Sequence, residues 1–405
     1  MAADSYYSRS ITGLAAAVLM VTSLGVLPLA AWAEGFDLHE HEYRSDPVVL
    51  SFSTVGDSRQ DPKHPDPTTL PLSGQDALWL QNSKALTRII RSVEAQKSNF
   101  LFFNGDMIMG YGNAGVPADT STVAAIVDSD LVKFYQQYAY WRGMMATLME
   151  HGTYVVPVPG NHEVQSKADG KKAQVVNEDA WRANMGDLIL DTGRFQTLFR
   201  AQPENVNVAN NGPYDGLTSD QSKLSYSFDF HGAHFTIINT DPVGDDAHAP
   251  VNWLATDLAA AQARGMQHFF VFGHKPAYTY YYGADPGAPL PDHPAGLDNY
   301  PDSRDAFWDV IEQYGATYFC GHEHIFNMMQ PRAAQGGSAW QVLVGSGGSP
   351  FEAAPTDSTV SPATDRTYAW ATVRVYKSGH VRVTAYGFND HFGQTRVLKS
   401  VVLAH

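Results

Sequence analysis

The amino-acid sequence predicts an α/β fold, and two observations carry that prediction. Short apolar segments rich in β-branched and aromatic residues recur along the chain, and each ends abruptly in polar or glycine residues, as strands buried on both faces do. Between these segments, apolar residues recur at spacings of three and four, which is typical of amphipathic helices. Strands and helices that alternate in this way indicate an α/β fold.

In chain order, we expect strands at residues 48–55, 100–103, 154–158, 234–238, 269–272 and 317–320, and then at 340–344, 369–376 and 381–386. Helices are expected at 76–96, 128–150, 252–264 and 303–314. The stretch from about residue 340 is rich in strands and poor in helices, so we expect it to complete a second sheet. Segments rich in Gly, Asn and Pro at 111–119, 202–220 and 282–301 predict surface loops or partial lids.

The first 33 residues predict a secretory signal. They carry only two charged side chains, and an apolar run over residues 11–32 ends in the small residues around Ala33. The run is close to the roughly 20 residues that span a bilayer, so the alternative is a retained membrane anchor. Pro28 and the polar Glu34 favour cleavage after Ala33. We therefore expect a periplasmic or secreted domain over residues 34–405, without membrane contact after cleavage and with loop insertions at about 111–127 and 164–224.

Charge and cysteine content exclude several classes of protein. The chain has 27 Lys and Arg against 42 Asp and Glu, a net charge of −15, and it lacks the basic stripe that a nucleic-acid polymer would require. Its one cysteine, Cys320, cannot form an intrachain disulfide or a zinc site built on paired thiolates. Any metal must therefore be held by His, Asp, Glu or Asn.

Such residues follow five of the predicted strands, where ligands bind in open α/β sheets. Taken singly, each is usually a turn or a structural residue, but a group of them at one edge of a core would be costly without a bound ion. A glycine before each motif allows a sharp turn and a close backbone approach. Residues two apart at a strand end face the same side, so His322 and His324 can share one site. The candidates are Asp57, Asp106, Asn161 with His162, His274, and His322 with His324.

The ordered series of these motifs resembles the signature of the calcineurin-like metallophosphoesterases, and most closely their exported branch related to purple acid phosphatases. The resemblance spans roughly residues 48–388. It implies a four-layer α/β/β/α sandwich with two mixed β-sheets, and an enzyme that hydrolyses small phosphate mono- or diesters. The motifs are Gly56-Asp57, Gly105-Asp106, Gly160-Asn161-His162-Glu163, Gly273-His274 and Gly321-His322-Glu323-His324.

The resemblance also implies roles for these residues. Two adjacent metal ions would share Asp106; Asp57 and His324 would complete the first site, and Asn161, His274 and His322 the second. Oxygen ligands mixed with imidazole suit Fe, Mn or Zn in a divalent or trivalent state, and a bridging carboxylate allows two cations about 3.5–4 Å apart. His162 would assist the leaving group, because an imidazole titrates near neutral pH.

The sequence departs from the family pattern at two positions. Arg59 stands where many members have a metal-ligating histidine, and arginine cannot ligate, so we expect the first ion to bind more weakly than the second. Arg59 is a candidate substrate-phosphate clamp, with a structural ion pair as the alternative. Met109 stands where purple acid phosphatases have a tyrosine and Ser/Thr phosphatases an aspartate. The nearest tyrosine is Tyr111, so a tyrosinate–iron colour is not expected, and the residue that orients His162 stays open.

Other readings stay open at this stage. Tyr278 is a candidate substrate-binding residue; together with Tyr280, Tyr281 and Tyr282 it follows His274 closely, and these aromatic side chains could stack on a base or a sugar or simply pack the loop. Gly56-Asp57-Ser58 also resembles the nucleophile block of GDS-type serine esterases, and residues 245–248 supply an Asp-x-x-His, although the Gly-x-Asn-Asp block is missing. A non-catalytic binding protein of the same fold is the third possibility. The physiological substrate and the oligomeric state are not predicted.

Overall fold

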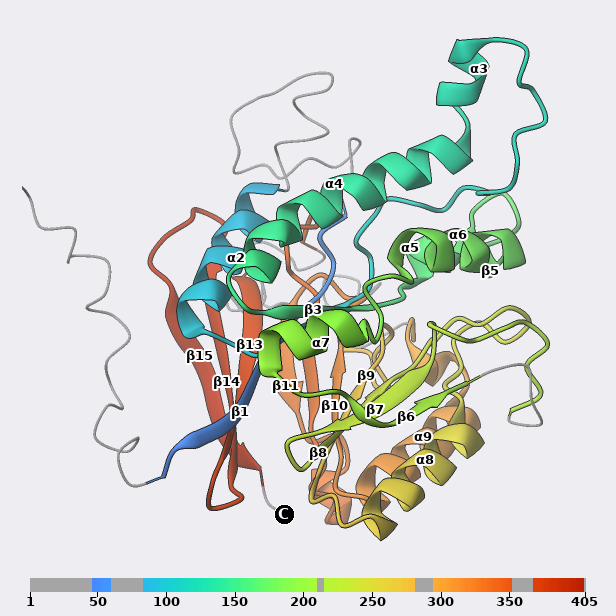
Figure 1. The fold of residues 1–405 in the computed structure, drawn as a ribbon. Helices are drawn as coiled ribbons and strands as arrows, with labels where there is room; N and C mark the ends of the chain where they lie inside the picture. Colours follow the sequence, from blue (N-terminus) through green and yellow to red (C-terminus); the bar gives the residue numbers. More distant parts are fainter. Residues whose placement is uncertain (1–45, 60–82, 210–214, 281–293, 352–366, 404–405) are drawn as a thin grey trace, which may run out of the picture. The chain divides into compact units, whose positions relative to one another are not determined.

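Two large β-sheets lie face to face, with helices on the outer side of each (Figure 1). The computed structural model describes residues 46–59, 83–209, 215–280, 294–351 and 367–403, all within one compact unit. The expected signal sequence and the tyrosines at 281 and 282 lie outside the described residues. The arrangement is the four-layer α/β/β/α sandwich that the family resemblance implied.

The first sheet combines parallel and antiparallel pairs. β1 pairs in parallel with β2, and β2 in parallel with β3, while β1 pairs antiparallel with β13 on its other side. The order across the sheet is β15 (Arg396–Leu403), β14 (Val381–Asn389), β13 (Thr367–Tyr376), β1 (Val48–Val55), β2 (Phe100–Asn104) and β3 (Tyr154–Val158).

The second sheet is also mixed. Its centre is parallel, with β8 beside β9, β9 beside β10 and β10 beside β12, and antiparallel strands close both edges. The order is β11 (Phe326–Met329), β12 (Gln341–Val344), β10 (Thr317–Cys320), β9 (His268–Phe272), β8 (Ala233–Ile237), β7 (Tyr226–Phe230) and β6 (Glu204–Val208). A separate small pair is formed by β4 (Gln165–Ser166) and β5 (Lys172–Ala173).

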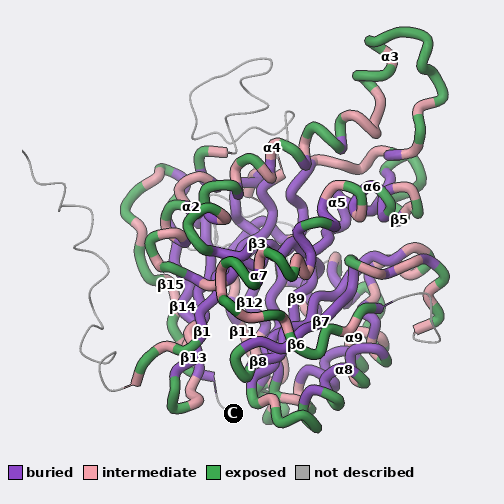
Figure 2. The backbone as a smooth tube through the Cα atoms, in the orientation of Figure 1, coloured by how far each residue is buried: buried purple, intermediate pink, exposed green. Residues whose placement is uncertain are grey.

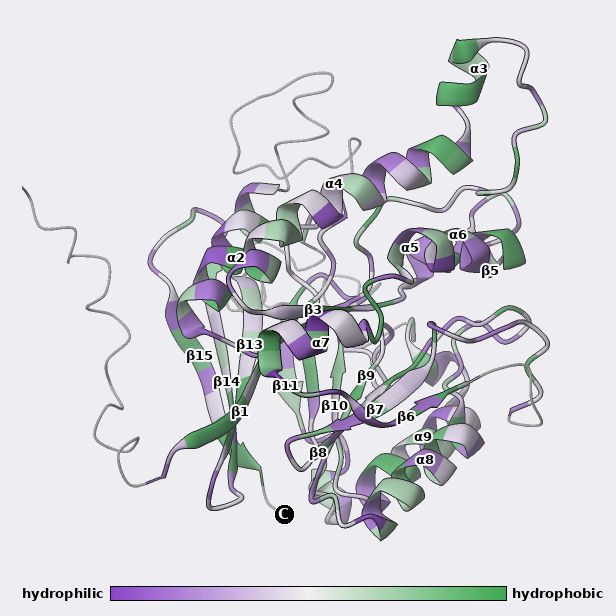
Figure 3. Ribbon diagram, viewed as in Figure 1, coloured by the Kyte–Doolittle hydropathy of each residue, from purple (hydrophilic) through white to green (hydrophobic). Residues whose placement is uncertain are grey.

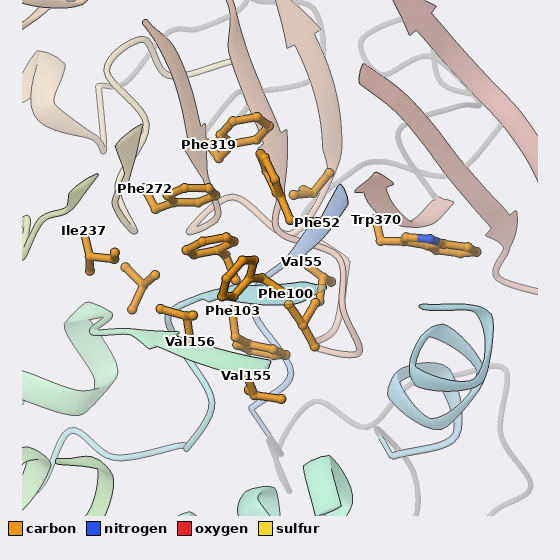
Figure 4. Close-up of a cluster of buried hydrophobic side chains, with 14 of the residues drawn as sticks. Phe52, Val55, Phe100, Phe103, Val155, Val156, Ile237, Phe272, Phe319 and Trp370 are labelled. Carbon is orange, nitrogen blue, oxygen red and sulfur yellow. The ribbon is translucent and has the colours of Figure 1, made fainter. Parts of the chain in front are cut away.

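Aromatic side chains from both sheets fill the space between them (Figure 4). Phe52 of β1 makes edge contacts with Phe270 and Phe319 of the second sheet, with ring centroids 4.8 Å and 5.7 Å apart. Phe102 of β2 stacks on Phe272 of β9 at 3.8 Å. Such interdigitated rings fix the distance between the sheets, and therefore between the loops at their ends.

Helices cover the outer faces, and they bury only one side each. α2 shows hydrophobic and hydrophilic residues alternating along its length (Figure 3), and Leu86, Ile89 and Val93 are among its buried residues. α2 and α4 cover the first sheet, and α8 and α9 enclose a second core against the other sheet. The helices are α2 (Ser83–Gln96), α3 (Val123–Val127), α4 (Asp130–Glu150), α5 (Asn161–Val164), α6 (Val175–Met185), α7 (Thr192–Phe199), α8 (Val251–Ala263) and α9 (Pro301–Gln313), with short 3₁₀ turns η2 (Leu297–Asn299) and η3 (Ala333–Gln335).

Burial follows the layers, with the central strands buried and the outer helix faces and α3 exposed (Figure 2). Among the helices of the described ranges, none combines the length and the apolar character that crossing a bilayer requires.

Two sequence expectations about the fold are wrong. The C-terminal strands do not all complete the second sheet: β12 joins it, but β13 to β15 extend the first, with Ser53 of β1 opposite Thr372 of β13. The strand that pairs with β1 lies more than 300 residues away, so no local pattern in the sequence indicates the pairing. The segment expected as a loop insertion at 164–224 contains α6, α7 and β6, and β6 also falls within the loop expected at 202–220. β6 reads as a loop because its residues are polar and mostly exposed.

Candidate metal centre

The sequence motifs meet at the carboxyl ends of β1, β2 and β3 in one sheet and of β9 and β10 in the other. Asp57 follows β1 with a left-handed backbone (φ 61°), and its N–H donates to the Gly105 carbonyl at 3.0 Å. Its buried carboxylate accepts the His322 main-chain N–H at 3.0 Å and 3.1 Å. A Cβ on Gly321 would lie 2.1 Å from that carboxylate, so only glycine fits there. The first and last motifs are therefore in direct contact.

Asp106 follows β2, again with a left-handed backbone (φ 54°). One of its oxygens lies 3.2 Å from His274 Nε2 and accepts the His162 main-chain N–H at 3.2 Å. Burial alone would raise the pKa of Asp106, but the neighbouring His162, His274 and Arg59 outweigh burial and hold this pKa well below its usual value. The side chain is therefore an ionised carboxylate at the centre of the cluster.

Glu163 fastens this loop to the next one. Its carboxylate accepts four main-chain N–H groups, those of Asp106 (2.9 Å), Met107 (2.9 Å), Ile108 (3.1 Å) and Gly160 (2.8 Å). The side chain is fully buried, and burial together with the Asp106 charge raises the pKa of Glu163, while these N–H donors counter that rise. One carboxylate therefore sets the conformation of two loops that carry candidate ligands.

Three further side chains converge on His274 Nε2. His274 Nδ1 lies 2.7 Å from the Asn104 carbonyl, which can only accept, so Nδ1 carries a proton, and a neutral ring then has its lone pair on Nε2. Around Nε2 lie Asn161 Oδ1 at 2.8 Å, His322 Nδ1 at 3.2 Å and the Asp106 oxygen at 3.2 Å. Asn161 Oδ1 also lies 2.9 Å from His322 Nδ1. In their unprotonated forms, these oxygen and nitrogen atoms are ligands that Fe, Mn or Zn accept, so the residues present fit a metal ion.

His324 is arranged in the same way on the other side of the cluster. Its Nδ1 lies 2.6 Å from the Pro350 carbonyl, and its Nε2 lies 3.6 Å from Asp57 Oδ1. Burial and nearby positive charge keep the pKa values of His322 and His324 well below the usual value, so both imidazoles are neutral and can offer a lone pair. Ligand atoms of Asp57, Asp106 and His274 lie within 4.8 Å of one another.

His162 occupies the edge of this cluster. Its Nδ1 lies 2.5 Å from the Met109 carbonyl, and its Nε2 lies 3.7 Å from Asp106 Oδ2. Burial lowers the pKa of His162 to about 3, Arg59 contributes in the same direction, and Asp106 opposes both. The group that orients His162 is thus a main-chain carbonyl at the position where the sequence shows only a methionine. No side-chain pattern could have indicated it.

Arg59 lies against two of the candidate ligands. Its Nη2 is 3.3 Å from His324 Nε2, and its Nε is 3.6 Å from Asp106 Oδ2. Its Nη1 is 3.8 Å from the Met109 sulfur. The guanidinium therefore lies close to His324 and Asp106, two residues that the sequence assigns to the first ion.

Tyr278 lies elsewhere. Its hydroxyl accepts from Arg332 Nε at 3.0 Å, and its ring makes an edge contact with Trp308 of α9 at 5.4 Å. These contacts hold the side chain against the second core. Its role in substrate binding stays a prediction, which Tyr278→Phe would test.

Serine-esterase chemistry finds no support at Ser58. Its hydroxyl has no hydrogen-bond partner among the described residues and lines a small cavity beside Met107 and Trp141. His248 contacts Asp245 at 3.1 Å and the ring of Tyr300 instead. A serine nucleophile requires a base within hydrogen-bond reach, and the described residues place none there.

Comparison with known proteins agrees with this geometry. Residues 37–326 match the model of the calcineurin-like phosphoesterase family. No curated protein matches the sequence. Among solved structures, the chain is similar to the purple acid phosphatase PPD1 of yellow lupin (Lupinus luteus), with a TM-score of 0.52 and 15% identity over 87% of this chain and 53% of that one. The chain thus spans about half the length of the lupin protein, and the likeness concerns the fold.

Two further solved structures resemble the chain less closely by TM-score. A dimetal phosphatase from Danio rerio has a TM-score of 0.46 and 11% identity, covering 88% of this chain and 99% of its own. GAP50, described as the anchor in the inner membrane complex of Plasmodium, has a TM-score of 0.46 and 14% identity, covering 87% of this chain and 88% of its own.

Proposed function

The chain belongs to the calcineurin-like phosphoesterase family, whose members hydrolyse phosphoric esters, and from this premise we propose that it hydrolyses small phosphate mono- or diesters at a dinuclear metal centre. The observation that carries the proposal is the group of oxygen and nitrogen atoms from Asn161, Asp106 and His322 around His274 Nε2, at 2.8 Å to 3.2 Å. Carboxylate and amide oxygens mixed with imidazole nitrogens form a ligand set that suits Fe, Mn or Zn.

The ligands divide between the two ions as the motifs suggest. Asp106 lies between the two groups and would be shared. Asp57 and His324 would complete the first site, and Asn161, His274 and His322 the second. Bound ions of this kind, Fe, Mn or Zn, lower the pKa of a coordinated water towards neutrality and neutralise charge on the phosphoryl oxygens.

His162 would then assist the departing oxygen. With Nδ1 directed at the Met109 carbonyl, only Nε2 can transfer a proton towards the site. Because burial lowers the pKa of His162 to about 3, the ring is neutral near neutral pH. An anionic phosphoryl group beside the ring would stabilise the imidazolium, so substrate binding itself favours the protonated form that donates to the leaving group.

Arg59 would bind the substrate phosphate. Its guanidinium offers planar paired donors that match phosphoryl oxygens. In the structure these donors face Asp106 and His324, so an incoming phosphate must draw them away from the ligands. The structural ion pair with Asp106 is the alternative that the Arg59 variant in the Discussion tests.

Export is a further part of the proposal. It rests on the apolar segment 11–32, which lies outside the described residues. Mass spectrometry of the mature N-terminus tests it: a protein that begins at Glu34 supports export with cleavage, whereas an intact N-terminus contradicts cleavage.

The central experiment is metal removal. Protein stripped by a chelator should lose hydrolysis of nitrophenyl phosphates, and adding back Fe, Mn or Zn singly and in pairs should restore it with two ions per chain by elemental analysis. Comparing nitrophenyl mono- and diesters gives the substrate class. Hydrolysis at full rate by the metal-free protein would refute the proposal, and two bound ions without hydrolysis of any ester would support a non-catalytic binding protein.

A further inference from the structure

Tyr111 reaches the metal centre from a strained turn. Its backbone is left-handed (φ 61°), which is uncommon for a tyrosine, and its N–H donates to the His162 carbonyl at 3.1 Å. Gly110 before it has φ 45°, and a Cβ there would lie 1.8 Å from the same carbonyl. The chain is thus pressed against His162 at a point where only glycine fits, and this places the tyrosine beside the candidate ligands.

The hydroxyl of Tyr111 accepts a hydrogen bond from Asn161 Nδ2. An amide side chain has one donor end and one acceptor end, so this bond turns Asn161 Oδ1 towards His274 and His322, at 2.8 Å and 2.9 Å. The Tyr111 hydroxyl holds the amide by its NH₂ end, and this contact leaves Oδ1 on the side of the imidazoles.

The ring of Tyr111 packs on the other functional side chain. Its centroid lies 3.8 Å from that of the His162 imidazole, at an interplanar angle of 42°. The Met109 carbonyl fixes one nitrogen of this imidazole, and the tyrosine ring covers one face. Together they leave Nε2 directed into the site.

We propose that Tyr111 is the positioning residue of the metal centre: its hydroxyl keeps the Asn161 oxygen in the orientation that binds the second ion, and its ring holds the plane of His162. The first part concerns metal binding alone. The second part rests on the function proposed above.

The hydroxyl is tested by Tyr111→Phe, which keeps the ring. Titration of chelator-stripped protein with Zn²⁺ should show the tighter of the two binding steps weakened by about 10- to 100-fold, the usual effect of losing a group that orients a metal ligand. Tyr135→Phe, on the outer side of α4 and 63% exposed, is the matched control and should bind Zn²⁺ as the wild type does.

A second background separates orientation from general damage. Asn161→Asp replaces the amide by a carboxylate with two equivalent oxygens, which needs no orienting partner. In that background Tyr111→Phe should change Zn²⁺ affinity less than in the wild-type background, because either oxygen of the carboxylate can face the ion. An equal loss in both backgrounds, or no loss in the wild-type background, would overturn the orienting role. A wild-type protein that binds no Zn²⁺ would overturn the metal centre as well.

The ring is tested by Tyr111→Leu. We expect kcat to fall by about tenfold or more for alkyl phosphates, which need a protonated leaving group, and less for nitrophenyl phosphates. Tyr111→Phe should show no such difference between leaving groups. Equal losses for both substrate types in Tyr111→Leu would overturn the proposed contact with His162 while leaving the Zn²⁺ result intact.

Discussion

The two sheets contribute to the site in different ways. The loops after β1, β2 and β3 carry the candidate oxygen ligands Asp57, Asp106 and Asn161, whereas the loops after β9 and β10 carry the candidate imidazole ligands. The main chain holds the oxygen ligands in position: Asp57 and Asp106 have left-handed backbones, and the Glu163 carboxylate accepts four main-chain N–H groups. The imidazoles of His274 and His324 are each oriented by one hydrogen bond from Nδ1 to a main-chain carbonyl.

This difference indicates where the site is vulnerable. A carbonyl acceptor is present at every residue, so the orientation of the imidazoles tolerates changes in the side chains that supply it. The oxygen half depends on one buried carboxylate and on glycines that leave no room for a Cβ. We therefore expect mutations on the first sheet to disturb the geometry of the centre more than mutations on the second.

His162 is the exception, because it is an imidazole on the oxygen side, and it gives the largest expected effect. His162→Ala should keep both metals and lose about 10²- to 10⁴-fold in kcat, the range for a general acid or base. The loss should shrink for esters with acidic leaving groups. His248→Ala, outside the site, is the control. Loss of metal from His162→Ala would place this histidine among the ligands instead.

Glu163→Gln tests whether the four hydrogen bonds from main-chain N–H groups to Glu163 position the candidate ligands. The amide NH₂ of the variant would face N–H donors that the carboxylate now satisfies, so we expect metal affinity to fall by about 10- to 100-fold. Zn²⁺ titration measures it. Glu178→Gln is matched for burial, since Glu178 accepts from Gln221 and Val243 away from the site. If both variants lose stability but bind metal equally well, the Glu163 carboxylate does not position the ligands.

Arg59→Ala is expected to have a smaller effect, with two parts of opposite sign. KM should rise about tenfold, because a charged donor to the phosphate is lost, and the second metal should stay in place. The weaker of the two metal-binding steps should tighten, because a cation no longer lies 3.3 Å from His324 Nε2. An unchanged KM with a lower melting temperature would favour the structural ion pair.

The smallest effect concerns an imidazole of the second sheet outside the site. His234 Nδ1 and Nε2 lie 2.6 Å and 2.9 Å from Asp229 and Asp257. Burial lowers the pKa of His234, but these two carboxylates outweigh burial and raise it above 6.5, whereas the pKa values of both aspartates fall below 3.8. The triad therefore stabilises the fold most between these values, and its contribution is lost above the raised His234 pKa and below the lowered aspartate pKa values.

Urea unfolding of the wild type and of His234→Asn checks this pH dependence. The advantage of the wild type should be larger near about pH 5.5 than near about pH 8.5. A difference that does not change with pH would show that folding leaves the pKa of His234 unchanged, and an advantage that is larger near about pH 8.5 would show that the imidazole is neutral in the folded protein.

The sequence predicted most of the central strands and brought the right motifs together, because buried strands and glycine-flanked motifs are local signals. Val48–Val55, Tyr154–Val158 and Thr317–Cys320 have the expected bounds. Features that depend on distant partners were missed. The pairing of β13 with β1 leaves no pattern in the local sequence. Every residue has a main-chain carbonyl, so the sequence does not single out that of Met109. Tyr111 reaches the site only through a left-handed turn.

The position of β1 has a consequence for folding. This strand lies between β2 and β13, and Asp57 at its end is held by main-chain bonds to Gly105 and Ser349, the latter nearly 300 residues later. Contacts that close such long loops form slowly. The loops fastened by Glu163 span far fewer residues and can form earlier. Because the chain is synthesised from the N-terminus, the part of the centre around Asp57 is completed only when the last strands dock. We therefore expect the protein to become able to bind both metal ions late in folding.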